Sequence, residues 1–292
     1  MHRLLQASFI FILLGIIHIL PGSIVFAETK VVYPGPEYWA DERHRDIIEI
    51  LRTALAKTER DYGPYSLIEA SAVMNTGRAD NSLIQQKYIN IAWGSTSIEK
   101  ERKLLPIRIP LRKGILGYRL MLTTLSGQKK TAEIQDIEGL KKVVLAQGLG
   151  WGDVEVLSRA GLNVVTANYE NIFKMLNKHR VDLFPRGVNE VFDELELNWE
   201  DYPNIIIGQN LLLKYAWPYY FFFNKRDTEL AARIETGLWR MIEDGSFDAI
   251  FEKYNRADIE QGDLRSRKMI ELDNPILPEE TPLEDERLWF NP

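Results

Sequence analysis

Two long apolar segments, residues 107–124 and 205–223, constrain this chain more than any other feature. Each is much longer than an ordinary strand of about five or six residues, and each contains internal Gly or Pro. Between them the chain alternates strand-like runs with helical periodicity, a pattern typical of α/β architecture with largely parallel sheets. We therefore predict that the chain leaves one α/β lobe through the first segment, builds a second lobe, and returns through the second segment to complete the first.

Short-range hydrophobic patterns predict the remaining elements. Apolar residues recur at three- and four-residue spacing in four predicted helices, at 47–55, 169–176, 230–241 and 247–254. Short apolar runs predict strands at 31–33, 67–73, 89–93, 142–146, 164–165 and 181–184. The polar stretch 125–135 is predicted to be a loop of the second lobe.

The N-terminus is typical of an export signal. His2 and Arg3 precede an apolar run over 4–20, and Pro21 and Gly22 lead to a Val-Phe-Ala ending at Ala27. This pattern predicts a signal peptide, residues 1–27, removed after Ala27. The alternative is an uncleaved membrane anchor, because the run is close to the ~20 residues needed to span a bilayer. Export of a chain without cysteine fits a bacterial periplasm.

Composition excludes several classes of protein. The chain is 45% hydrophobic and 27% charged, which is ordinary for a globular protein, and its net charge of −6 argues against nucleic-acid binding. The absence of cysteine excludes a disulfide scaffold, a thiol nucleophile and a thiolate metal site. The two histidines beyond residue 27, His44 and His179, are far apart and lack carboxylates at metal-ligand spacing. We therefore expect no metal, no cofactor and no enzymatic activity.

Four segments in order resemble the type II periplasmic solute-binding proteins, specifically the family 3 group that captures amino acids for ABC transporters. They are Trp-Gly-Ser-Thr-Ser with Glu-Arg at 93–102, a strand, glycine loop and helix at 141–156, Arg-Val-Asp at 180–182, and the Ile-Glu-Asp-Gly helix pair at 242–251. The resemblance covers about residues 30–254. It implies two lobes joined by two crossovers, which close by hinge bending on a ligand in the cleft between them.

The resemblance and the chain pattern together predict the domain organisation. After the signal peptide, residues 28–113 and 218–265 form the discontinuous first lobe, and residues 114–217 form the second lobe. Residues 266–292, rich in proline and acidic side chains, are predicted to be a tail packed on the first lobe.

Three candidate ligand contacts follow the predicted strand at 89–93. Arg102 falls where family members carry the arginine that grips the α-carboxylate of the ligand, and a guanidinium suits bidentate pairing with a carboxylate. The alternative is that Arg102 is a solvated residue in a charged helix start. Thr96 and Ser97 are candidates for hydroxyl and N–H donation to the same carboxylate, which is compatible with a helix-capping role.

The glycine loop of the second lobe supplies the next candidates. Gly148 and Gly150 lie between a predicted strand and helix, where free N–H groups and the helix dipole favour an anion. The family usually has a Gly-Thr pair at this place, and Trp151 replaces the threonine. Trp151 then either stacks on a ligand or packs in the core. A dinucleotide site is disfavoured because Asp153 stands where the third glycine is needed.

Arg186 is the main departure from the family pattern. An acidic residue in this neighbourhood normally accepts the ammonium of the ligand, whereas an arginine repels an ammonium and attracts a second acidic group. The alternative is that Glu190, four residues later, neutralises Arg186 as a helical ion pair. The candidate aromatic walls of the cleft are Tyr33, at the end of the first predicted strand, and Trp217, Tyr219 and Tyr220, at the second crossover, with core packing as the alternative.

These features predict a monomeric periplasmic protein that captures a small anionic or amino-acid-like ligand, carrying a carboxylate, and delivers it to an ABC permease. A sensor or interaction module on the same fold, with a degenerate cleft, is the alternative. A lyase or dehydratase is a further alternative, and it needs an acid and a base, such as Glu69 or Glu190, in the cleft.

Overall fold

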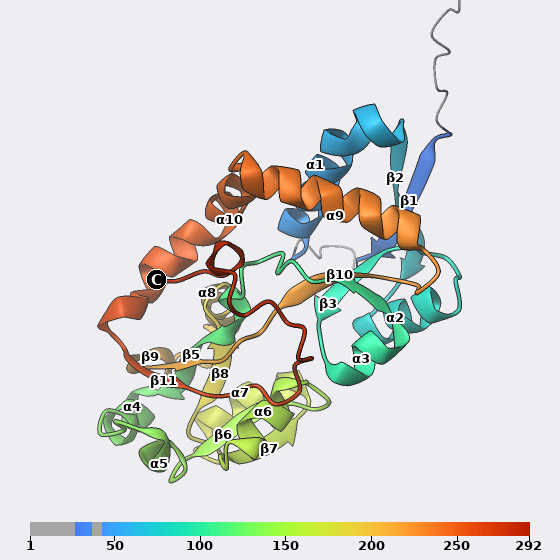
Figure 1. Ribbon diagram of the computed structural model, residues 1–292. Helices are drawn as coiled ribbons and strands as arrows, with labels where there is room; N and C mark the ends of the chain where they lie inside the picture. The colour runs from blue at the N-terminus through green and yellow to red at the C-terminus, as the bar shows by residue number, and fades with distance from the viewer. Residues whose placement is uncertain (1–26, 37–42) are drawn as a thin grey trace, which may run out of the picture.

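The computed structural model describes residues 27–36 and 43–292, so the predicted signal peptide lies almost wholly outside the described residues. The described chain is a mixed α/β structure whose elements gather in two groups, one above the other in Figure 1. We call these the first and second lobes. Across the described ranges, no helix is both long and apolar enough to cross a membrane.

The first lobe is built on two small sheets. β1 (Thr29–Gly35) and β2 (Tyr65–Val73) are parallel, while β10 (Tyr219–Phe223) lies between β3 (Ala92–Ser95) and β4 (Leu105–Ile107) and is antiparallel to both. Two long helices, α1 (Arg45–Tyr62) and α9 (Thr228–Glu243), pack together over this lobe. Gly237 permits their close approach, because a Cβ there would lie 2.2 Å from the carbonyl oxygen of Ala54.

Two short helices of the first lobe begin with capped N-termini. α2 (Thr76–Ile84) follows Asn75, whose side chain accepts a hydrogen bond from the Arg78 N–H. α3 (Ile98–Lys103) follows Ser97, whose hydroxyl accepts from the Lys100 N–H. Such side chains satisfy N–H groups that the first turn of a helix leaves unpaired.

The second lobe contains a four-stranded sheet in the order β11-β9-β5-β8 and a parallel pair, β6-β7. Its elements are β5 (Tyr118–Thr124), α4 (Leu125–Thr131), α5 (Ile137–Leu140), β6 (Val144–Gly148), α6 (Asp153–Arg159), β7 (Asn163–Ala167), α7 (Tyr169–Asn177), β8 (Phe184–Gly187), α8 (Val191–Asn198), β9 (Ile205–Lys214) and β11 (Lys268–Glu271). The predicted strands and helices of both lobes all correspond to observed elements, although their ends differ and α1 and α10 continue well beyond the predicted ends at residues 55 and 254.

Two expectations about local structure were wrong. The sheets are mixed rather than largely parallel, because β5 and β9, like β4 and β10, run antiparallel as the chain passes between the lobes and returns. The stretch predicted as a loop at 125–135 begins with helix α4. Thr124 starts this helix by accepting a hydrogen bond from the Gly127 N–H, a cap that the polar composition concealed.

The C-terminal region contacts both lobes. α10 (Ser246–Gly262) places Phe247 in the core of the first lobe and Phe251 in that of the second. β11 then pairs in parallel with β9 of the second lobe, before the chain returns towards the first lobe (red in Figure 1). The expectation that residues 266–292 form a tail packed on the first lobe was therefore wrong for their first part, because β11 completes a sheet of the second lobe.

Candidate functional site

A cavity of about 380 Å³ lies where the two lobes and the C-terminal tail meet. The first lobe lines it with residues along helices α2 and α3 and at the end of β3, and the second lobe lines it with Gly152. Trp217, in the crossover between β9 and β10, and Ile276 of the tail complete it. The lining residues are Thr76, Gly77, Asp80, Asn81, Ile84, Ser95, Thr96, Ser97, Glu99, Lys100, Lys103, Leu104, Gly152, Trp217 and Ile276.

Two predicted contact residues, Thr96 and Ser97, line this cavity at the end of β3. The Thr96 hydroxyl donates a hydrogen bond to Glu101 Oε1 over 2.6 Å, and its side chain is buried. The Ser97 hydroxyl accepts the Lys100 N–H over 3.2 Å and so caps α3. Both hydroxyls are therefore held in fixed positions by local hydrogen bonds at the edge of the cavity.

Lys100 carries a cationic group beside these hydroxyls. Its ammonium lies 3.0 Å from Asp80 Oδ1 of α2 and 4.1 Å from the centre of the Phe222 ring. Burial lowers the pKa of Lys100 below its ordinary value, and the carboxylate of Asp80 opposes this shift. The pair links the middle of α2 to the first turn of α3, and both residues line the cavity.

Arg102 lies on the exposed face of α3, away from the cavity lining. Arg102 lies two positions after Lys100, which corresponds to a rotation of about 200° around the helix. The two side chains therefore project from nearly opposite faces. Sequence reasoning missed Lys100. The spacing Ser97-x-x-Lys100, from a cap to the third residue of the helix, was the signal that could have found it.

The glycine loop presents only part of its predicted surface to the cavity. Gly152 lines it, whereas Trp151 packs against Phe184, with ring centres 6.2 Å apart. Trp151 also lies on Gly148, where a Cβ would be 2.2 Å from the indole ring, so the glycine is required by this packing. Gly150 turns the loop with a φ of +80°, a conformation that glycine adopts without strain.

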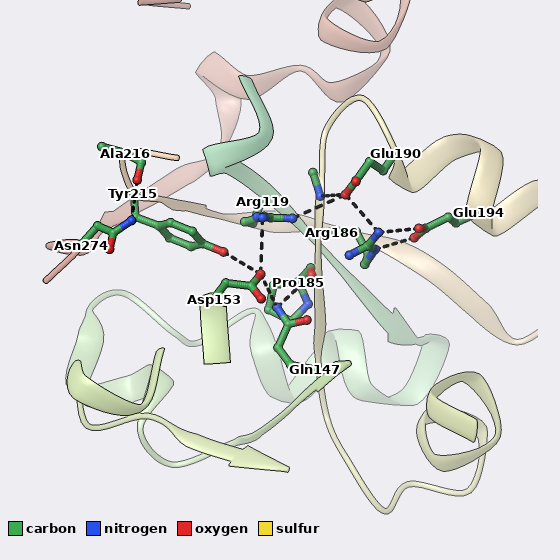
Figure 2. A network of polar contacts seen from close by, with 11 residues as sticks. Arg119, Gln147, Asp153, Pro185, Arg186, Glu190, Glu194, Tyr215, Ala216 and Asn274 are labelled. Carbon is green, nitrogen blue, oxygen red and sulfur yellow. Dashed lines mark hydrogen bonds and ion pairs between the residues drawn. The ribbon is translucent and has the colours of Figure 1, made fainter. Parts of the chain in front are cut away.

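Arg186 is paired within the second lobe. Its guanidinium donates two hydrogen bonds to the Glu194 carboxylate, over 2.6 and 2.5 Å, and lies 3.0 Å from Glu190 Oε2. Figure 2 shows Arg186 pointing to both acids. The predicted neutralisation by Glu190 therefore occurs, although Arg186 is in strand β8 and Glu190 precedes α8, so the pair does not lie on one helix.

A second arginine extends this network towards the crossovers. Arg119 of β5 is 4% exposed and lies 3.4 Å from Asp153 and 3.5 Å from Glu190. The Tyr215 hydroxyl and the Gln147 amide also donate to Asp153, over 3.1 and 3.0 Å (Figure 2). Charged groups buried in this way need such partners, and here they join β5, β6, α6 and the second crossover.

The pKa values of the two glutamates in this network shift in opposite directions. Burial acts to raise the pKa of Glu190, but Arg186 and Arg119 outweigh it and hold the pKa below its ordinary value. For Glu194, burial outweighs the attraction of Arg186 and raises the pKa.

The remaining predicted residues lie apart from the cavity. Tyr33 is buried in the first lobe, packs 5.9 Å from the Trp93 ring, and donates a hydrogen bond to Glu69 over 3.5 Å. Glu69, one of the two acids considered for a lyase, is exposed on β2. The exception is Trp217, another candidate aromatic wall, which lines the cavity. Ile276 also lines it and was not anticipated, because it lies beyond the segments that resemble the family.

Comparisons with known proteins agree with this fold. No protein-family model matches the chain, and no curated protein does. Solved structures of the type II periplasmic binding fold match it, as the four sequence segments predicted, so the fold is that of these solute-binding proteins.

Three similar structures illustrate the match. An ancestral arginine-binding protein bound to arginine is 20% identical, with 78% of this chain and 97% of that chain covered and a TM-score of 0.51. A structure from glutathione import in Streptococcus mutans is 12% identical, with 78% and 95% covered and a TM-score of 0.54. An ancestral amino-acid-binding protein, a precursor of cyclohexadienyl dehydratase, is 16% identical, with 78% and 94% covered and a TM-score of 0.51.

Proposed function

We propose that this protein is a periplasmic solute-binding protein that holds a small, carboxylate-bearing ligand between its lobes for ABC-type uptake. The observation that carries the proposal is the cavity lined by both lobes, with polar groups of the first lobe on one side and Gly152 and Trp217 on the other. Binding sites of this kind are concave, with a few placed polar groups that orient the ligand.

The lining chemistry suits an amino-acid-like ligand. The Ser97 hydroxyl and the Lys100 ammonium are donors for a carboxylate, while Asp80 and Glu99 are acceptors for an ammonium. Trp217 offers an apolar surface for a side chain. One similar structure is bound to arginine and another comes from glutathione import. Both molecules carry a carboxylate and an ammonium, which supports the same ligand class here.

The pairing of Arg186 bears on the choice between an ordinary amino acid and a dicarboxylate. Arg186 is not among the residues that line the cavity, and its guanidinium is paired with Glu194 and Glu190, so it is not placed to meet a second acidic group of a ligand there. We therefore favour a ligand with one α-carboxylate. The predicted export, the ABC permease partner, the monomeric state and closure by hinge bending all belong to this proposal.

One observation favours the second candidate, a sensor or interaction module. The carbonyl oxygen of Ile276 accepts the Ile98 N–H at the start of α3, and Ile276 lines the cavity, so a segment of the protein itself lies against the place where a ligand is proposed to bind. In this alternative the cleft is filled by the tail, and no small molecule stabilises the protein.

A thermal-shift screen separates the two candidates. The mature protein is heated with amino acids, dicarboxylates and sugar acids in turn, and a ligand at a hundred times its Kd adds about 2.7 kcal/mol to the free energy of unfolding. Lys100→Ala is expected to reduce this stabilisation, whereas Arg102→Ala, on the exposed face of the same helix, is the matched control. Stabilisation that depends on Arg102 instead of Lys100 would overturn the assignment of the contact residue, and no stabilisation by any compound would favour the module.

A further inference from the structure

The tail begins as part of the second lobe. Lys268–Glu271 pairs along β9, and the Leu272 N–H donates to the Lys214 carbonyl oxygen over 2.8 Å. The Asn274 side chain then donates to the carbonyl oxygen of Ala216, also over 2.8 Å, in the crossover that leads back to the first lobe. Figure 2 shows Asn274 beside Ala216 and Tyr215.

The same segment next attaches to the first lobe. The Ile98 N–H donates to the carbonyl oxygen of Ile276 over 3.0 Å, which fixes the tail to the first turn of α3. Farther along, Thr281 is buried, and Glu280 lies 3.8 Å from Arg108. Residues 272–281 therefore run from the β9 sheet of the second lobe to helix α3 of the first lobe and beyond it.

The end of the chain closes against the first crossover. The Phe290 N–H donates to the Lys113 carbonyl oxygen over 2.7 Å, and the Tyr118 hydroxyl donates to the Phe290 carbonyl oxygen over 2.8 Å. Trp289 lies over Gly114, where a Cβ would be 2.5 Å from the indole ring. Both ends of residues 272–290 are thus held, one at the β9 sheet and the other beside the first crossover.

We propose that residues 272–281 form a strap that holds the two lobes together and closes one side of the cavity, and that the Ile98–Ile276 hydrogen bond is its releasable attachment to the first lobe. Separation of the lobes stretches a segment that is fixed on both sides, so this bond must break or the strap must leave β9. Up to residue 276 the strap is attached to the first lobe by this single hydrogen bond, whereas β11 is held to β9 by a ladder of backbone pairs. Its loss leaves the contacts farther along, at Thr281 and Glu280, as the next attachment to the first lobe.

The strap is tested without any ligand, so the outcome does not depend on the proposed solute-binding function. Ile98→Pro removes the donor N–H, and proline is favoured at the first position of a helix. Ser97, which precedes it, already has the extended backbone that a residue before proline adopts, with φ −158° and ψ 160°. Ile98→Ala is the matched control, since it shortens the same exposed side chain and keeps the N–H.

Two measurements follow each variant. Amide hydrogen exchange at Ile276 and Leu277 is expected to rise about fivefold in Ile98→Pro, as the loss of one hydrogen bond predicts, while exchange at Ile270 in β11 stays unchanged. Spin labels on Glu235→Cys in α9 and Lys174→Cys in α7 report the distance between the lobes. The chain has no other cysteine to label. Ile98→Pro is expected to add a second distance population that Ile98→Ala lacks.

Equal distances in the two variants would overturn the strap, even if the tail exchanges faster, because the tail would then detach without releasing the lobes. If Ile98→Pro does not fold, Asn274→Ala is the second test of the strap. It removes the hydrogen bond that the Asn274 side chain donates to the Ala216 carbonyl oxygen and the one that it accepts from the Ile276 N–H. Asn171→Ala, at an exposed position in α7, is its control. The same new distance population in Asn274→Ala supports the strap, and an unchanged distance overturns it.

Discussion

Arg186 and Glu194 form a two-point hydrogen-bonded ion pair inside the second lobe, with Nε–Oε2 and Nη2–Oε1 distances of 2.6 and 2.5 Å. The arginine is 6% exposed, so its charge depends on protein partners rather than on water. The pair joins strand β8 to helix α8. A residue that the sequence presents as a ligand contact is thus part of the internal structure of the lobe.

Glu194→Gln is expected to lower the free energy of unfolding by about 2 to 4 kcal/mol, because Arg186 stays buried and loses the carboxylate that accepts two of its hydrogen bonds, while the ion pair with Glu190 remains. Urea denaturation measures this loss. Glu196→Gln, two residues along the same helix and exposed, is the control and should change stability by less than about 0.5 kcal/mol. Similar losses in both variants would mean that the pair contributes no more than a surface charge.

Asp46 and Arg112 form another buried pair, between the start of α1 and the first crossover, with distances of 2.6 and 2.8 Å. Asp46→Asn is expected to cost about 3 kcal/mol, because it leaves the guanidinium without its buried counter-charge. Lys113 and Asp248, next to this pair, offer the comparison, since Asp248 is largely exposed. Asp248→Asn should cost less than about 1 kcal/mol by the same measurement. Equal costs would contradict the role assigned to burial.

Gly117 marks the point where the two crossovers pass each other. A Cβ at this position would lie 2.0 Å from the carbonyl oxygen of Tyr215, which is main chain and cannot turn away. Gly117→Ala is therefore expected to lower the free energy of unfolding by about 1 to 3 kcal/mol, as overpacking does. Gly77→Ala is the control, because its Cβ would meet only Asn75 Oδ1 at 3.8 Å and alanine favours a helix. A stable Gly117→Ala variant would show that the crossovers can separate easily.

Asp258 makes stability depend on pH. Burial, with a contribution from Asp193, raises its pKa from 3.8 to about 6, so the folded protein favours the protonated acid. The cost is absent below the unfolded pKa and grows as pH rises through the folded pKa, between about pH 4 and pH 6. Since the side chain is only partly buried, we expect about 1 to 2 kcal/mol at pH 7.

Asp258→Asn should consequently raise the melting temperature at pH 7.5 and leave it unchanged at pH 3.5. Melting curves across this range measure the difference between the variant and the parent protein. Asp273→Asn, at an exposed position in the tail, is the control. A gain that is the same at every pH would contradict the titration of Asp258 as its cause.

Much of the fold was predictable because it depends on local patterns. Apolar residues at helical spacing predicted α1, α7, α9 and α10. The two long apolar segments contained strands next to the passages between the lobes, β5 in the first segment and β9 with β10 in the second. Strand direction was not predictable in the same way. A strand has the same residue pattern in a parallel and an antiparallel pair, and only the return of the chain between lobes makes these pairs antiparallel.

Part of the candidate site was also predictable from local sequence. Thr96 and Ser97 follow a strand directly, so local sequence places them at its end, where they line the cavity. Arg102 was placed from motif spacing, but helix rotation turns it to the exposed face and brings Lys100 to the cavity.

The sequence by itself determined the order of elements, the α/β class and the two passages between lobes, because these follow from short-range hydrophobic periodicity. Only the tertiary structure decided which charged side chains line the cavity and which are paired away from it. Arg186 meets Glu194 from a different element, and Ile276 meets Ile98 from the far end of the chain. Contacts of this kind depend on how packed elements orient their side chains and backbone groups, which no local pattern encodes.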